Sequence, residues 1–118
     1  MDRRDALKTI VLAFLPAPAF AAPSISTVIG NGSPGYSDQQ VNNPYGILVR
    51  GSALYFCDLD NQRIRRLDLT TRQTSTVAGD GQRAYRGDGG PAIAGSLNMP
   101  HEIAFDSSGH MYIAERDN

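Results

Sequence analysis

Two eight-residue stretches of the chain share one pattern. "LYFCDLDN" occupies positions 54–61 and "MYIAERDN" occupies 111–118, so that apolar and aromatic residues lead in each case into a polar turn ending in Asn. After the first stretch the chain continues as "QRIRRLDLTT" (62–71). Internal repeats indicate an architecture more strongly than single segments do. The rest of the chain is therefore interpreted as further parts of this repeat.

Two further blocks recur in the same order. "STVIGNG" (26–32) matches "STVAGDG" (75–81), and "NNPYGILV" (42–49) matches "NMPHEIAF" (98–105). The spacing between copies grows mainly within the Gly- and Pro-rich segment 82–97. Loops tolerate such insertions and strands do not, which indicates a repeated unit with a variable loop.

Each repeat is predicted to contain four short strands. The segments are rich in aromatic and β-branched residues, are about five residues long, and are separated by turn residues. No segment shows helical periodicity over a useful length. In the first repeat the expected strands are 46–50, 53–58, 63–69 and 74–79. Four-stranded units of about 50 residues, repeated around an axis, form a propeller.

The same residues resemble a known repeat. "P-x-G-I-x-V" (44–49), "L-Y-x-x-D-x-x-N-x-R-I-R" (54–65) and "T-x-x-G" (76–79) are similar to the NHL repeat. The second copy, preceded by "GDGGPA" (87–92), resembles the long-loop version of exported bacterial NHL proteins. The resemblance covers 25–118 and implies an all-β fold, a β-propeller of four-stranded antiparallel NHL-type blades, usually of about six blades.

Only about two blades of such a propeller are present. One blade is expected at about 45–79 and an incomplete one at about 99–118, within a partial propeller spanning 22–118, and "SISTVI" (24–29) is expected to be an outer strand awaiting a partner blade. Because blades bury their faces against neighbours, we expect this chain to be the N-terminal part of a longer protein whose missing blades are its partners. The alternative is a short protein that completes its ring by oligomerising.

Residues 1–21 have the composition of an export signal peptide. Basic residues Arg3, Arg4 and Lys8 precede the apolar run 9–15, and Ala19-Phe20-Ala21 offers small residues for cleavage after Ala21. The run is shorter than the ~20 apolar residues of a membrane span, so no span is expected. A periplasmic or secreted location follows.

The export route is open at this stage. "RRDALK" (3–8) resembles the twin-arginine signal but has Ala6 where that signal usually carries a large apolar residue. An ordinary secretory signal with two adjacent arginines is the alternative.

The charge and composition of the chain indicate which classes of partner it is suited to bind. The formal charge is −1 and 41% of residues are hydrophobic, which fits a folded chain and gives no basic surplus for nucleic acid. The single cysteine, Cys57, lies in an apolar stretch and is expected to be buried and unreactive.

Some residues recur at the turns. Asp58 and Asn61 flank the turn before Arg63, and Glu115 and Asn118 occupy the equivalent places in the second copy. Short polar side chains stabilise turns by bonding to the turn's own backbone, and Arg63 is placed to bridge to a carboxylate. We interpret all five as structural residues.

Residues that differ between copies are better candidates for binding. At the strand entry Tyr45 and Gly46 are replaced by His101 and Glu102. In a propeller these positions lie near one mouth of the central channel, where ligands bind, so Tyr45, His101 and Glu102 are the channel-mouth candidates.

His101 is also a metal candidate, because "MPHEIAF…YIAERDN" resembles the corresponding stretch of peptidyl-hydroxyglycine amidating lyases, which are zinc propellers. Of the zinc ligands that this resemblance implies, only His101 is found in this chain, and a zinc site needs three or four ligands.

Other motifs do not carry a function. "GNGSPG" (30–35) fits the dinucleotide pattern G-x-G-x-x-G, but Pro34 removes a donor and no helix is predicted to follow. "RGD" (86–88) lies inside the long loop of the resemblance and is interpreted as coincidental.

The resulting prediction is a ligand- or protein-binding or scaffold module with no cofactor, whose catalytic residues, if any, are unknown. The alternative is an enzyme, either a metal-dependent lyase using zinc or calcium or a gluconolactonase-like hydrolase. Fold alone does not separate the two.

Overall fold

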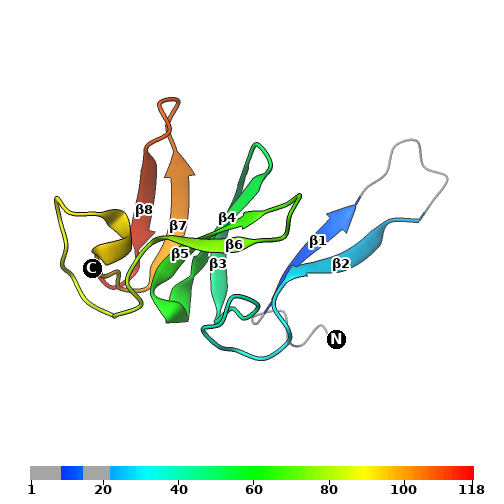
Figure 1. Ribbon diagram of the computed structural model, residues 1–118, viewed down its shortest axis with the longest axis horizontal. Helices are drawn as coiled ribbons and strands as arrows, with labels where there is room; N and C mark the ends of the chain where they lie inside the picture. The colour runs from blue at the N-terminus through cyan, green and yellow to red at the C-terminus, as the bar shows by residue number, and fades with distance from the viewer. Residues whose placement is uncertain (1–8, 15–21) are drawn as a thin grey trace.

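The computed structural model describes residues 9–14 and 22–118, and within them all regular structure is extended apart from two single 3₁₀ turns (Figure 1). The strands are β1 (Ile10–Phe14), β2 (Ser24–Ile29), β3 (Pro44–Arg50), β4 (Ala53–Asp58), β5 (Arg63–Asp68), β6 (Thr74–Ala78), β7 (Pro100–Phe105) and β8 (Met111–Glu115). The 3₁₀ turns are η2 (Leu59–Asn61) and η3 (Ala92–Ala94).

Three antiparallel sheets follow one another along the chain. The four-stranded sheet has the order β3-β4-β5-β6 and is flanked by the hairpins β1–β2 and β7–β8. Figure 1 shows the four-stranded sheet between the two hairpins. The all-β prediction with a four-stranded antiparallel blade is therefore confirmed, and the strand limits agree with the predicted ones to within two residues.

The central strands of the four-stranded sheet, β4 and β5, are covered on both faces, which explains the composition of β4. Five of its six residues are buried, and the chain has apolar side chains on both faces of this strand. A strand that alternates apolar and polar residues has one solvent-exposed face, whereas a strand with an almost continuous apolar run is buried on both faces. The run "ALYFC" thus encodes a central position in a stack of sheets.

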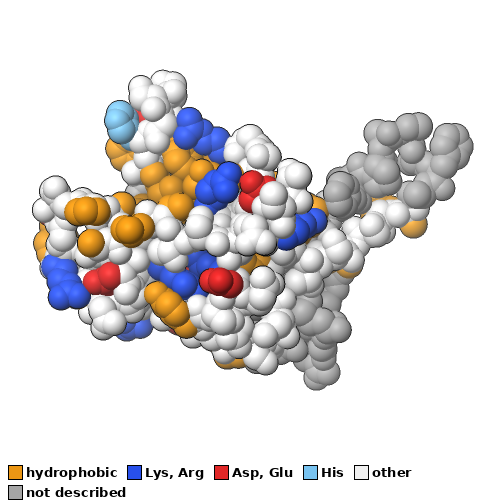
Figure 2. Space-filling view, in the orientation of Figure 1, with side chains coloured by type: hydrophobic (Ala, Val, Ile, Leu, Met, Phe, Trp, Pro, Cys, Tyr) orange, Lys and Arg blue, Asp and Glu red, His pale blue; other side chains and the backbone are white. Residues whose placement is uncertain are grey.

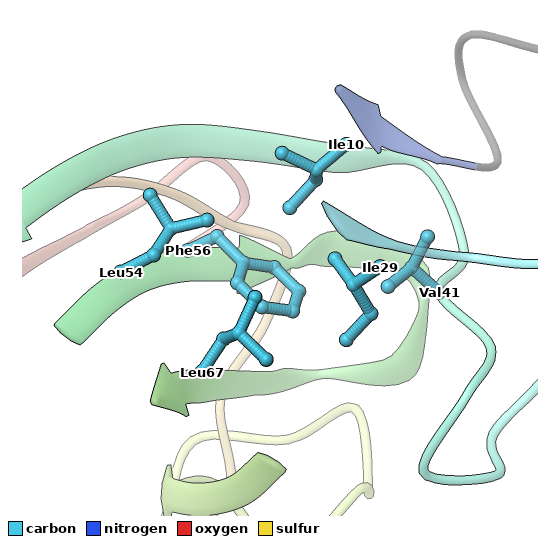
Figure 3. Packing of buried hydrophobic residues seen from close by; sticks show 6 residues of the cluster. All are labelled: Ile10, Ile29, Val41, Leu54, Phe56 and Leu67. Atoms are coloured by element: carbon cyan, nitrogen blue, oxygen red, sulfur yellow. The ribbon is translucent and has the colours of Figure 1, made fainter. Parts of the chain in front are cut away.

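One face packs against the N-terminal hairpin. Its core cluster, labelled in Figure 3, places Leu54 and Phe56 of β4 against Ile29 at the end of β2. The remaining members are Ile10, Val41 and Leu67. Each of the six side chains is at most 5% exposed, so burial of this cluster contributes strongly to stability at about 1.5–3 kcal/mol per large apolar side chain.

The opposite face packs against the C-terminal hairpin. The second core cluster joins Cys57, Ile64 and Ala78 of the four-stranded sheet to Ile103 of β7. Figure 2 shows hydrophobic side chains gathered between the β7–β8 hairpin and this sheet. The two clusters make a stack of three sheets, as expected of neighbouring propeller blades.

The predicted export signal overlaps a strand. Ile10–Phe14 lies inside the predicted signal and pairs antiparallel with β2, with the Thr9 hydroxyl donating to the carbonyl of Ile29 at 3.2 Å. The paired arginines and the Ala19-Phe20-Ala21 cleavage site lie outside the described residues. Cleavage after Ala21 stays a prediction, and it would remove β1 and leave β2 without this partner.

No helix in the described part of the chain has the length and apolar character needed to cross a membrane.

Candidate functional site

Two aromatic side chains meet where the innermost strands begin. The rings of Tyr45 on β3 and His101 on β7 lie 4.4 Å apart between centroids, tilted by 32°. Tyr45 is 38% exposed, so the pair is open to solvent on one side. The structure thus brings together two of the three predicted channel-mouth residues, and such an amphipathic pair combines apolar surface with polar edges.

Gly46 makes this meeting possible. It lies at a bulge between Tyr45 and Ile47 and has φ +52°. A Cβ at this position would sit 2.7 Å from the carbonyl oxygen of His101 and 3.0 Å from Cα of Glu102. Only glycine permits this approach of two backbones without strain, so Gly46 sets the distance between β3 and β7.

Glu102 completes the predicted set and affects the cysteine behind it. Its side chain is exposed and its carboxylate lies next to Gly46. Burial of Cys57, with a smaller contribution from the negative charge of Glu102, raises the pKa of the thiol to about 12. Cys57 is fully buried and protonated at neutral pH, which agrees with the unreactive role expected from the sequence.

We call the surface around Tyr45 and His101 the rim, and charged side chains of both signs lie near it. Arg116 donates to Asp117 at 3.1 Å, and this hydrogen bond is the main reason why the pKa of Arg116 is raised, with smaller contributions from Tyr45 and Asp60. Arg116, Asp117 and Asp60 therefore place charges of both signs near Tyr45.

Asp58 is the centre of a buried network below the rim. Its carboxylate is fully buried and accepts hydrogen bonds from the Asn42 backbone N–H at 2.8 Å, from Asn61 Nδ2 at 2.9 Å and from Arg63 Nε at 2.9 Å. The expected bridge from Arg63 is present. Asp58 and Asn61 differ from expectation in their backbone partners, because they bind the preceding loop, including the carbonyl of Gly35, instead of their own turn.

Sequence reasoning missed the role of Arg65. Its guanidinium is 1% exposed, lies 3.6 Å from Asp58 Oδ2, and donates to the backbone carbonyls of Gln40 and Asp38 at 2.6 Å each. Burial lowers the pKa of Arg65, and the nearby charge of Arg63 adds to the effect. The alternation of arginines in "RIRR" was the available signal, because alternate residues of a strand share a face.

The loop before β3 is held down by these arginines. The guanidinium of Arg63 lies 3.8 Å from the ring centroid of Tyr36 and donates to the Tyr36 carbonyl at 2.8 Å. A cation over an aromatic face adds to the hydrogen bond. The loop therefore covers the outer part of the sheet face and leaves the inner strand open.

The second copy repeats the arrangement on a smaller scale. Glu115 accepts from the Asn98 backbone N–H and from Asn118 Nδ2, both at 2.6 Å. Asn98 corresponds to Asn42, Glu115 to Asp58 and Asn118 to Asn61 in the repeat. The same two bonds therefore tie the loop before the inner strand to the turn in both copies, which is consistent with the structural role predicted for these side chains.

The long loop is tied together by its own polar residues. Arg86 donates to Asp80 at 3.0 Å and to the Ser96 hydroxyl at 2.8 Å. The first residue of "RGD" is therefore used within the loop, and Asp88 accepts from Tyr85 at 3.3 Å. These bonds support the interpretation of that tripeptide as coincidental.

A second polar cluster, not expected from the sequence, lies at the other end of β7. Asp106 Oδ2 contacts His110 Nδ1 at 2.8 Å and accepts from the Tyr112 hydroxyl at 3.1 Å, while Oδ1 accepts the backbone N–H groups of Ser108 and His110. The His110 N–H is the main cause of a lowered Asp106 pKa. The cluster closes the β7–β8 turn, and it lies at the opposite end of the strand from His101.

Metal ligands are sparse in the described residues. Nowhere in 9–14 and 22–118 do three or more His, Cys, Asp or Glu side chains converge so that they could hold a metal ion. Within these residues His101 and Glu102 have no third such side chain beside them, whereas a zinc site takes three or four ligands.

Comparison with curated proteins finds relatives that carry the same repeat. The chain is 31% identical over 96 residues to NHL repeat-containing protein 2 of Bos taurus and 31% identical over 87 residues to that of Homo sapiens. These matches cover 76% and 69% of this chain but only 13% and 12% of the relatives. No family model matches the chain.

Comparison with solved structures finds the same architecture. The auxiliary nutrient binding protein of Bacteroides ovatus superposes with a TM-score of 0.77 at 22% identity, covering 94% of this chain and 31% of that one. The auxiliary nutrient binding protein of Bacteroides thetaiotaomicron gives a TM-score of 0.74 at 20% identity, covering 93% and 30%. The chain thus spans less than a third of each of these structures.

Proposed function

This chain belongs to the NHL-repeat proteins of β-propeller architecture, and from that premise we propose that it is an exported binding module whose ligand contacts the Tyr45–His101 pair. The observation that carries the proposal is the half-exposed aromatic stack held by Gly46 at the junction of two inner strands. Ligands of propellers bind near such channel mouths.

The chemistry of the rim supports a small polar ligand. Two aromatic rings offer apolar area, their hydroxyl and imidazole groups offer hydrogen bonds, and Glu102 offers an acceptor. The nutrient-binding descriptions of the two Bacteroides proteins motivate the choice of a nutrient-type molecule, such as a sugar, an amino acid or a short peptide.

The binding proposal is tested with the two histidines of the chain. A panel of mono- and disaccharides, amino acids and tripeptides is titrated into the protein by calorimetry. His101→Ala and Tyr45→Ala are expected to weaken binding at least about tenfold, which is the loss of one good contact. His110→Ala, which alters an exposed histidine at the far end of β7, is the matched control. Equal weakening by His110→Ala, or binding unaffected by both mouth variants, contradicts the assignment.

Export is the second element of the proposal, and it is supported by the basic, apolar and small-residue segments of 1–21. In a Gram-negative bacterium the protein is expected in the periplasm with Ala22 as its first residue. Replacing both Arg3 and Arg4 by Lys distinguishes the routes, because twin-arginine export depends on the arginines and general secretion accepts lysines. Cytoplasmic protein retaining Met1 contradicts export.

The enzyme alternative lacks a specific observation in its favour. His101 and Glu102 are two groups without a converging third, and His101 has Tyr45 as its ring partner. A lyase or lactonase activity would need further residues at this mouth. We propose the binding role because the exposed Tyr45–His101 stack is the observation that favours it.

A further inference from the structure

A buried glutamine links the four-stranded sheet to the start of β7. Gln62 follows η2, precedes β5 and is 3% exposed. Its Oε1 accepts a hydrogen bond from the backbone N–H of Met99 at 2.7 Å, and its Nε2 lies 3.5 Å from Met99 Sδ. Because a backbone N–H is only a donor, these two contacts fix which way the amide faces. Two residues 37 positions apart are thereby joined.

Met99 has a backbone conformation that does not suit its residue type. Its φ is +59°, in the left-handed region that favours glycine and that asparagine tolerates. The same place in the first repeat is taken by Asn43, with φ +56°. The repeat that carries His101 therefore has a methionine where the first repeat has a residue suited to this φ. The bond from Gln62 and the burial of Met99, which is 5% exposed, stabilise the conformation.

Little freedom remains between Met99 and the ring of His101. The carbonyl of Met99 accepts from the backbone N–H of Arg116 at 2.9 Å, so both backbone polar groups of Met99 are bound. The one residue in between is Pro100, whose ring fixes its own φ and whose side chain is fully buried. The direction in which the chain enters β7, and with it the place of His101, therefore depends on how Met99 is held.

Gln62 is itself held in place. Its φ of 55° and ψ of 44° are left-handed, and its backbone N–H donates to the carbonyl of Leu59 at 3.0 Å. Gly79 lies so close that a Cβ there would overlap the carbonyl oxygen of Gln62. A side chain that is buried and leaves a fixed backbone keeps one orientation, which is what a positioning role requires.

The sheet that carries Gln62 also carries the ring partner of His101. Tyr45 on β3 is opposite Cys57 of β4 in the strand register, and η2 follows β4 directly. The Tyr45–His101 stack joins two sheets, so its geometry depends on the contacts that fix one sheet against the other. Gly46 provides such a contact from β3, and Gln62 provides one from the turn between β4 and β5.

We propose that Gln62 is a positioning residue of the Tyr45–His101 site. Through Met99 and Pro100 it holds the His101 ring where that ring stacks on Tyr45. Its effect on ligand affinity rests on the proposed binding function, whereas its effect on the placement of the ring does not. A residue that acts in this way matters for binding only while His101 is present.

Gln62→Asn breaks the link with little other change. Asparagine keeps the amide and suits the positive φ of this position, but it is one methylene shorter and does not reach the Met99 N–H. Adding Met99→Asn to this variant gives position 99 the residue type that has the same φ in the first repeat. If Gln62→Asn does not fold, Gln62→Met takes its place, because methionine keeps the length and lacks the amide oxygen.

Val41→Ala is the control for a general loss of stability. Val41 is fully buried in the first core cluster, on the other side of the sheet from Met99, so its truncation weakens the core without touching the link. Circular dichroism checks the fold of every variant. All measurements use the 118-residue chain.

The first measurement needs no ligand. The ring centroids of Tyr45 and His101 are 4.4 Å apart, so the NMR resonances of the His101 imidazole carry a ring-current shift from the tyrosine. The chain has two histidines, and His110 at the far end of β7 is the internal reference. In Gln62→Asn the His101 resonances are expected to move toward their positions in Tyr45→Ala, and to return when Met99→Asn is added. The His110 resonances, and both histidines in the control variant, are expected to stay.

The second measurement is the affinity for the sugar, amino acid or tripeptide of the panel that binds. Gln62→Asn is expected to weaken binding by about three- to tenfold, less than His101→Ala, because the ring is displaced and not removed. In the His101→Ala background Gln62→Asn is expected to have no further effect, since two residues that act as one unit do not contribute additively.

Several results would overturn the proposal. These are His101 resonances that do not move in Gln62→Asn, equal movement in Val41→Ala, and no return when Met99→Asn is added. An affinity that Gln62→Asn leaves unchanged, or losses that add when it is combined with His101→Ala, would count equally against it. Failure of the proposed function is a separate outcome: if no probe of the panel binds, the binding role fails, and the resonances still decide whether Gln62 places the ring.

Discussion

Removing the charge of Asp58 is expected to destabilise the four-stranded sheet more than any other conservative change. Asp58 is fully buried between Arg63 and Arg65, which are 4% and 1% exposed. The carboxylate is the acid that the structure pairs with these two guanidinium groups. Asp58→Asn keeps the shape and one acceptor oxygen but leaves two buried cations without a counter-charge.

The size of the effect follows from this geometry. Breaking a buried ion pair by removing one partner costs about 3–5 kcal/mol. The total stability of a domain is about 5–15 kcal/mol, so the variant should lose a large share of its free energy of unfolding. Loss of the loop contacts that Arg63 makes with Tyr36 is expected to follow, because its guanidinium would no longer be held in place.

The assay is urea unfolding followed by circular dichroism, with Asp60→Asn as the matched control. Asp60 is the exposed acid two residues away, and its change should alter the free energy of unfolding by less than about 0.5 kcal/mol. Glu115→Gln, the equivalent change in the second copy, is expected to cost about 1 kcal/mol because that carboxylate is half-buried and its partners are neutral. A loss below about 1 kcal/mol for Asp58→Asn would refute the role assigned to the buried pair.

Three further outcomes follow from the structure. Gly46→Ala should lower the free energy of unfolding in urea by about 2–3 kcal/mol, and Gly51→Ala by about 1 kcal/mol. Both glycines have positive φ, but only Gly46 faces a backbone within 4 Å. Equal losses would contradict the close approach of β3 and β7. Cys57, with its pKa raised to about 12, should resist iodoacetamide at pH 8 until the chain unfolds, and labelling of the native protein at the rate of a free thiol, measured by mass spectrometry, would contradict burial. The pKa of Asp80 is lowered, chiefly by the Gln82 backbone N–H, so its stabilising contribution is present above the unfolded pKa of about 4 and is lost as the pH falls below it. Asp80→Asn should therefore make the melting temperature decline less between pH 5 and pH 3. An unchanged decline would count against this bond.

The strand pattern was accessible from sequence because local chemistry encodes it. The β4 strand was predicted at its observed limits, since "ALYFCD" is bounded by Gly51-Ser52 and by a polar turn. The bridge from Arg63 to a carboxylate across the turn was predicted from the position of Arg63 after that turn, and the structure shows Asp58 as its partner. These features depend on residues close in sequence, where the geometry of a turn leaves few arrangements.

The candidate site was only partly accessible. Tyr45, His101 and Glu102 were selected because they differ between copies at the strand entry, but the stacking of Tyr45 on His101 depends on two strands 56 positions apart in the numbering. The burial of Arg65 and the pairing of β1 with β2 were not foreseen. Both involve partners that no local pattern specifies.

The sequence by itself determined the repeat, the strands within it and the polar residues that close each turn, because alternation, turn chemistry and recurrence are properties of neighbouring residues. Only the tertiary structure decided which sheet faces are covered and which remain open. That outcome depends on how whole sheets stack: Ile103 in the second repeat is buried, whereas its equivalent Ile47 in the first repeat is 57% exposed, although the local pattern is the same.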